Sequence, residues 1–350
     1  MACAPTSGAD TIAQNPSQNP SQNPSSSGQL ASQPAGVTVQ GAPPEWADTA
    51  TDVMAELAQW RGLSFTDDVQ VTFAPPDDPS LDGLNGWYNS TSKELVVGLN
   101  ESESMSRGVL LHEIFHALQD QHFDLYQLHR QSMDEPDYDK AVSAMIEGEA
   151  MLAVSEILDY DFLAHARLPA DGEISEDFFE SIFLYGAGLK FIKAIREEGG
   201  WAAVDAAFQK PPQATTLVLH PERYLAGDRT ISPIDVPLKP GETLRSQKVR
   251  GEYEVQWLLA RSPETRPLLA RVEDGYVADT LAMVRTEDGE TRHRWVVEFD
   301  SADVAELLVA GVEQALMNTA SDTTSDGEAS DAPAVLPVVS VVQTAIVAEW

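Results

Sequence analysis

Hydrophobic residues recur at helical spacing through most of the middle of the chain. From Trp46 to Trp60 the apolar positions follow a helical period, and Gly62 ends the pattern, which predicts a first helix. Further helices are predicted at Met105 to Arg130, Asp139 to His165, Ser175 to Glu197 and Trp201 to Phe208. Gly199 and Gly200 are expected to separate the last two.

Two pairs of segments have the shorter period or the β-prone composition of strands. Residues alternate from Val69 to Phe73, and Lys93 to Leu99 is β-prone, so these segments predict a small sheet. Strands at Tyr276 to Thr286 and Arg294 to Phe299, joined across a turn, precede a predicted helix at 303–317. The expected fold class is therefore α+β: a mostly helical domain with a small β-sheet, followed by a C-terminal strand–helix unit.

Composition divides the chain into four parts. Residues 1–43 are rich in Ser, Gln, Asn and Pro and predict a disordered stalk. Residues 44–230 form the predicted main domain and 231–318 a small α+β unit. Residues 319–350 form an acidic, low-complexity tail, in which the apolar stretch Val335 to Ala348 is assigned to no element.

The charge balance argues against two classes of partner. The chain has 22 Lys and Arg against 56 Asp and Glu, a formal net charge of −34. Such a field repels phosphate backbones and anionic lipid headgroups, so we expect no nucleic-acid and no membrane-surface partner. No run of 18 apolar residues is present, and no membrane span is predicted.

The single cysteine limits the possible metal chemistry. With Cys3 alone, neither a disulfide framework nor a cysteine-based zinc site can form, so a metal would need His and carboxylate ligands. Cys3 precedes a long polar tract, as at the start of a trimmed bacterial lipoprotein, although no apolar stretch precedes it. Lipid attachment and an ordinary terminal residue both fit this position.

The sequence His112-Glu113-Ile114-Phe115-His116 has the H-E-x-x-H pattern of a zinc site. Residues four apart lie on one face of a helix, so both imidazoles can reach one ion while Glu113 holds the attacking water. Apolar residues around the motif at helical spacing predict a buried helix and a site of low dielectric. The alternative is an amphipathic helix with two histidines on its surface.

A catalytic zinc ion needs a third protein ligand. Glu147 shares a helical stripe with apolar residues, and a metal would offset the cost of burying its carboxylate; a core ion pair with an Arg is the alternative. Glu149 is expected on a more polar face, where it is either exposed to solvent or supports a metal ligand. His122 stands where a longer version of the motif has its third histidine, but Gln119 replaces the glycine that would turn the chain.

These motifs together resemble the gluzincin clan of zinc peptidases. Glu147-Gly148-Glu149-Ala150 is similar to its E-G-x-A element, and Tyr185-Gly186-Ala187-Gly188 to the Y-x-x-G that follows in some members. The segments 116–125 and 219–224 resemble blocks of uncharacterised bacterial envelope proteins, which usually carry T-E-Q where this chain has Thr215-Thr216-Leu217. The resemblance covers about 46–224 and, weakly, 275–309.

The resemblance implies a zinc metallopeptidase, a hydrolase, outside the cytoplasm, in the envelope or secreted. Its metal would be Zn²⁺ on His112, His116 and Glu147, its substrate a peptide or protein, and Glu113 would take the proton of the attacking water. The alternative is an inactive zinc-binding or protein-interaction module on a peptidase fold.

Four further residues are candidates for supporting roles. His220 is the predicted oxyanion donor, because Pro221 favours an extended backbone that could present the ring to a cleft; a packed loop histidine is the alternative. Tyr185 and Tyr224 are weaker candidates for the same role. Asp120 could orient a ligand imidazole. No organic cofactor site is predicted.

Overall fold

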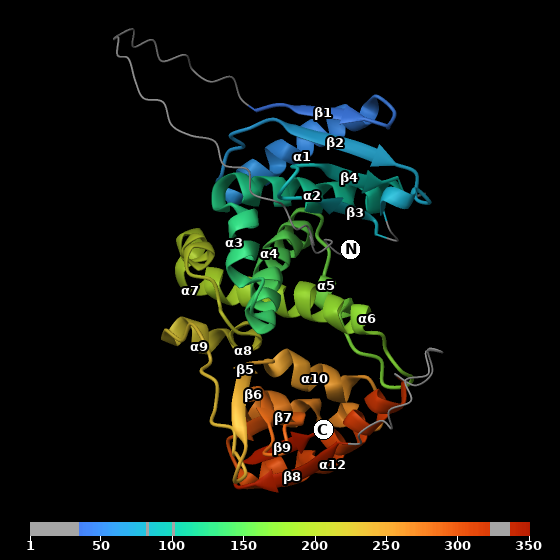
Figure 1. The fold of residues 1–350 in the computed structure, drawn as a ribbon. Coiled ribbons are helices and arrows are strands. Elements are labelled where there is room, and N and C mark those ends of the chain that lie inside the picture. The colour runs from blue at the N-terminus through green and yellow to red at the C-terminus, as the bar shows by residue number, and fades with distance from the viewer. Residues whose placement is uncertain (1–34, 82–83, 100–101, 323–336) are drawn as a thin grey trace, which may run out of the picture. The chain divides into compact units, whose positions relative to one another are not determined.

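The computed structural model describes residues 35–81, 84–99, 102–322 and 337–350 (Figure 1). The chain divides into two units, Met1–His122 and Phe123–Trp350, and each is described by itself. Helices and small sheets make up both, so the predicted α+β class is confirmed. Among the described residues no helix is long and apolar enough to cross a membrane.

The first unit is built on a four-stranded sheet. Its elements are β1 Val37–Gln40, α1 Glu45–Arg61, β2 Val69–Ala74, the 3-10 turn η1 Pro79–Leu81, β3 Gly86–Tyr88, β4 Leu95–Gly98 and α2 Glu103–Phe123. The strand order is β1-β2-β4-β3, with β3 antiparallel at one edge. Gly62 ends α1 in the left-handed conformation, with φ 76°, as the sequence predicted.

The helical part of the second unit begins directly after α2. It comprises α3 Leu125–Ser132, α4 Pro136–Ile157, α5 Phe162–His165, α6 Glu176–Ser181, the π-helix η2 Ile182–Ala187, α7 Gly188–Gln209, α8 Thr215–Leu219 and α9 Pro221–Ala226. The single helix predicted over 105–130 is wrong, because Asp124 has a φ of 52° and caps α3 by accepting from the Gln127 amide.

A five-stranded sheet with helices forms the rest of the second unit. Its elements are β5 Thr243–Lys248, α10 Glu252–Ala260, the 3-10 turn η3 Arg266–Leu268, α11 Leu269–Gly275, β6 Tyr276–Arg285, β7 Thr291–Phe299, α12 Ala302–Asp322, β8 Val338–Val342 and β9 Ala345–Glu349. The strand order is β5-β6-β7-β9-β8, all antiparallel. Apolar residues of α10 and α12 pack with Trp295, Val297, Phe299 and Ile346 on one face of this sheet.

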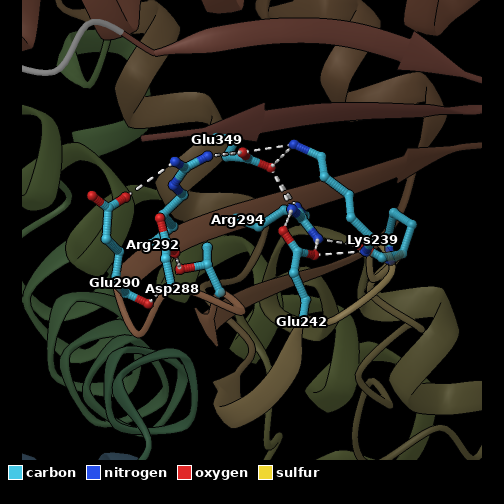
Figure 2. Close-up of polar contacts among 9 residues, drawn as sticks. Lys239, Glu242, Asp288, Glu290, Arg292, Arg294 and Glu349 are labelled. Atoms are coloured by element: carbon cyan, nitrogen blue, oxygen red, sulfur yellow. Dashed lines mark hydrogen bonds and ion pairs between the residues drawn. The ribbon is translucent and has the colours of Figure 1, made fainter.

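The other face of this sheet carries a network of paired charges (Figure 2). The Arg294 guanidinium is buried and donates to the carboxylates of Glu242 and Glu349. Lys239 and Arg292 also donate to Glu349. Burial raises the pKa of Glu349, but hydrogen bonds from Lys239 and Arg294 outweigh it and lower this pKa to about 2. Arg294, Arg292 and Lys239 on this face are therefore each paired with a carboxylate.

Two boundaries of the predicted low-complexity segments are wrong. Residues 37–40, assigned to the stalk, form β1, which pairs in parallel with β2. The unassigned apolar stretch 335–348 contributes the hairpin β8–β9, with Gln343 at the turn in the left-handed conformation. These three strands are short, and each depends on pairing with another strand, which periodicity alone does not reveal. Cys3 and the rest of residues 1–34 of the predicted stalk, and residues 323–336 of the predicted tail, lie outside the described residues.

Candidate metal centre

The two histidines of the motif lie on α2 with their rings side by side. Their Nε2 atoms are 3.0 Å apart, and the rings meet edge to face with centroids 4.6 Å apart. Two ligand nitrogens at about 2.05 Å from one tetrahedral ion would be separated by about 3.3 Å. The measured separation is close to that value, so the helix presents both nitrogens at a spacing that suits a shared ion.

Gln119 orients the second histidine. Its Oε1 lies 2.8 Å from Nδ1 of His116, and both side chains are buried. Because an amide oxygen only accepts, the Nδ1 atom carries the hydrogen and Nε2 keeps its lone pair for a metal. From the sequence, Gln119 was noted only as the residue that replaces a glycine. Its spacing of three residues from His116 on one helix is the signal that could have identified this contact.

Glu147 belongs to the same group as the two histidines. His112, His116 and Glu147 are all buried, each offers one ligand atom, and these atoms lie within 4.8 Å of one another. Two imidazoles and a carboxylate are a donor set that zinc accepts in catalytic sites. The group could therefore hold a metal ion, as the sequence predicted.

The local packing of α4 explains the glycine that follows Glu147. A Cβ atom built on Gly148 would lie 2.1 Å from the carbonyl carbon of Gly188, at the start of α7. In the reverse direction, a Cβ on Gly188 would lie 2.0 Å from the Ala144 carbonyl oxygen. The backbones of α4 and α7 can approach this closely only because both positions are glycine. Gly148 of the E-G-x-A element and Gly188 of the Y-x-x-G element therefore fix the position of the helix that carries Glu147.

Two other predicted candidates are held by partners of their own. The His122 ring nitrogen Nε2 lies 2.8 Å from the carbonyl oxygen of Ser64. Asp120 is buried, and its Oδ2 accepts from the Tyr88 hydroxyl at 2.6 Å and from the Lys93 ammonium at 2.5 Å. The group of possible metal ligands contains neither residue. Gln119 contacts the His116 ring, while the orienting role of Asp120 stays a prediction.

Glu113, Glu149 and Tyr185 are all buried. Glu113 lies on α2 between the two histidines and is 1% exposed. Glu149 is also fully buried, so the expected exposure to solvent is wrong, while the supporting role beside a metal ligand stays a prediction. Tyr185 lies in the π-helix η2, three residues before Gly188, and π-helical turns occur often at functional sites. Tyr224 donates its hydroxyl to the Lys210 carbonyl oxygen at 2.7 Å, which is a structural contact.

His220 faces a carboxylate that the sequence analysis did not identify. Its Nε2 lies 3.0 Å from Oε2 of Glu252, at the start of α10, and Glu252 is fully buried. The hydrogen bond with Glu252 raises the pKa of His220, and burial raises the pKa of Glu252. The metal-ligand group does not include His220, and its assignment as oxyanion donor stays a prediction.

Two further buried carboxylates, Asp279 and Asp137, lie near His220 and Glu252. Asp279 accepts from the amides of Arg250 and Gly251, which fixes the turn that leads into α10 and Glu252. Asp137, near the start of α4, accepts from the Thr215 amide at 3.0 Å. A Cβ on Gly251 would lie 1.7 Å from the Asp137 carboxylate, so the turn and this side chain are in close contact. Asp137 and Glu147 are ten residues apart, about 15 Å along the helix, so the carboxylate cluster is distant from Glu147.

The chain matches no protein-family model, no curated protein and no solved structure. The gluzincin resemblance therefore rests on the motifs quoted from the sequence alone.

The raised pKa of the buried Asp137 carboxyl predicts that the stability of the fold depends on pH. Burial raises its pKa from 3.8 to about 7, and the nearby negative charges of Asp279 and Glu252 also raise it. Between about pH 4 and pH 7 the unfolded chain loses the Asp137 proton and the folded chain keeps it, so the free energy of unfolding should fall by up to about 1.4 kcal/mol per pH unit. In Asp137→Asn this contribution is absent, while the amide oxygen can still accept from Thr215.

Urea denaturation at pH 5, 6 and 7 measures this slope. We expect a shallower fall in Asp137→Asn than in the wild type, and the same fall as wild type in Asp235→Asn, which makes the same change on an exposed side chain. The raised pKa of Asp279 and Glu252 acts in the same direction, so a residual slope should persist in the variant. Identical slopes in the wild type and Asp137→Asn would disprove a raised pKa at this position.

Proposed function

We propose that the chain is a zinc metallopeptidase that hydrolyses peptide bonds with a water molecule activated by Glu113. The observation that carries the proposal is the buried group His112, His116 and Glu147, in an H-E-x-x-H helix whose two imidazole nitrogens lie 3.0 Å apart. Burying the Glu147 carboxylate beside two imidazoles costs free energy, because the charge loses its hydration. A divalent cation bound by the three side chains offsets that cost.

The residues of the chain have separate tasks in the proposed reaction. When bound, zinc would lower the pKa of a water ligand and polarise the scissile carbonyl. Glu113 accepts the proton of the attacking water and returns it to the leaving amine. Gln119 holds the His116 ring in the tautomer that leaves Nε2 available. No step depends on His220, whose oxyanion role is still only predicted.

The neighbourhood of Glu113 supports an extended peptide as the substrate. Strand β3 is an edge strand, so it offers backbone groups that an added strand can pair with. A Cβ on Gly86 would lie 3.2 Å from Cγ of Glu113 and 2.6 Å from Cγ1 of Val109, which shows that this edge strand contacts the helix of the motif directly. A peptide paired to β3 would pass close to Glu113. We also propose an extracytoplasmic location, on the envelope-protein resemblance.

Cleavage of unfolded casein by the zinc-loaded protein tests the proposal. We expect hydrolysis that 1,10-phenanthroline stops and that added zinc restores. A protein that binds zinc, unfolds more easily on chelation and releases no peptides would instead be the non-catalytic zinc-binding module, the alternative that the sequence leaves open.

A further inference from the structure

A pocket of about 490 Å³ opens on the five-stranded sheet of the second unit. Its lining comes from β5, β6, β7, Arg250 after β5 and Trp350 after β9. It includes the basic side chains Lys248, Arg250 and His293 but no acidic residue. In a chain with 56 Asp and Glu against 22 Lys and Arg, a pocket lined only by basic, polar and apolar side chains is a local reversal of charge.

Strand register places these side chains on one face. Met283 is opposite Ser246 on one side and His293 on the other, and Leu281 is opposite Lys248. Directly opposite residues of an antiparallel pair project from the same face. Leu281 and Met283 therefore form an apolar floor between the basic side chains.

An aromatic pair closes one side of the pocket. The backbones of His293 and Trp350 exchange two hydrogen bonds, at 2.8 and 3.1 Å. Their rings lie 5.8 Å apart at an interplanar angle of 30°. Together with the apolar floor, these rings present flat, polarisable surface to a ligand.

The cations of the pocket differ from those on the opposite face of the sheet. There, Arg294, Arg292 and Lys239 are each paired with a carboxylate (Figure 2). Within the part of the chain that the structure describes, Lys248 has no ion pair. The Arg250 guanidinium donates to the Glu254 carboxylate at 2.7 Å, so its positive charge at the pocket is partly neutralised. Lys248 is therefore the main unmatched charge at this site.

We propose that this pocket binds a small organic anion, a carboxylate or phosphate attached to an apolar or aromatic body. The anionic group would lie at Lys248 and Arg250, and the apolar body on Leu281 and Met283 beside the ring of Trp350. A charge-assisted hydrogen bond requires a formal negative charge on the ligand, and the apolar floor favours a ligand that is more than an inorganic ion. This site is independent of the proposed peptidase activity.

Methyl resonances of ¹³C-methionine-labelled full-length protein report the binding. The Met283 resonance, assigned from its loss in Met283→Leu, is followed during titration with 3-phenylpropionate, phenyl phosphate, the neutral 3-phenylpropanamide and inorganic phosphate. We expect a saturable shift with one or both aromatic anions at concentrations up to about 10 mM, and none with the amide or with inorganic phosphate. Which aromatic anion binds tighter distinguishes a carboxylate site from a phosphate site.

Two matched variants test the role of charge. Lys248→Gln should weaken binding about tenfold or more. Arg245→Gln removes the same charge from the same exposed strand outside the pocket and should bind as wild type does. The absence of a saturable Met283 shift with either aromatic anion, equal binding of the neutral amide, or equal weakening in both variants would overturn the proposal. Because Lys248 is exposed, an unchanged melting temperature verifies that the variant is folded.

Discussion

Glu113→Gln is expected to leave zinc binding unchanged and to lower the rate of casein hydrolysis about a thousandfold. Glutamine has nearly the same shape as glutamate but cannot accept a proton from water. The three proposed ligands, His112, His116 and Glu147, are untouched by the change. The variant should therefore separate the loss of proton transfer from the loss of metal.

The measurement combines initial rates with elemental analysis of the same samples. Glu103→Gln is the matched control, because it makes the same change at an exposed position on the same helix. We expect the control to cleave as the wild type does and to carry the same zinc. Substantial hydrolysis by Glu113→Gln at full zinc content would show that another group activates the water.

Gly148→Ala is expected to have the largest effect on the fold around the site. The new Cβ would lie 2.1 Å from the Gly188 carbonyl carbon, and backbone atoms cannot move aside as a flexible side chain would. Helices α4 and α7 would have to separate, and Glu147, the adjacent residue, would move with α4. We expect the free energy of unfolding to fall by about 3 kcal/mol and zinc affinity to fall with it.

Gly186→Ala provides the comparison for this substitution. Gly186 is also buried and lies two residues before Gly188, but a Cβ there meets only the Ala166 methyl at 3.5 Å, an ordinary contact. Urea denaturation should show a change within about 1 kcal/mol for Gly186→Ala. If both variants unfolded at the same urea concentration as the wild type, the close approach of α4 and α7 would not exist in solution.

Much of the fold could be predicted where apolar period and capping residues agree. The first helix and its end at Gly62, the strands β2 and β4, and the pair β6–β7 follow this rule. Strand β5 was missed because every residue in it is exposed, so no apolar alternation marks it. The helix predicted over 175–197 also differs, since the turn at 182–187 is π-helical, and a one-residue change in hydrogen bonding leaves little trace in the apolar pattern.

The group of possible metal ligands was easier to predict than the buried polar residues beside His220. The H-E-x-x-H spacing specifies the chemistry of His112 and His116 locally, and the apolar stripe around Glu147 marks it as a carboxylate that needs a partner. Glu252 hydrogen-bonds to His220, and Asp279 holds the turn that leads to Glu252, but both come from segments far from His220 in sequence. A buried carboxylate in an acidic chain looks like any surface carboxylate until the tertiary structure is known.

Metal content is the most direct test of the central claim. Elemental analysis of wild-type protein, purified without chelators and dialysed against buffer, should find one zinc ion per chain, and His116→Ala should have lost it. The shared ligand group of His112, His116 and Glu147 predicts this difference. A wild-type protein with no bound transition metal, or a His116→Ala variant with as much metal as the wild type, would contradict the account.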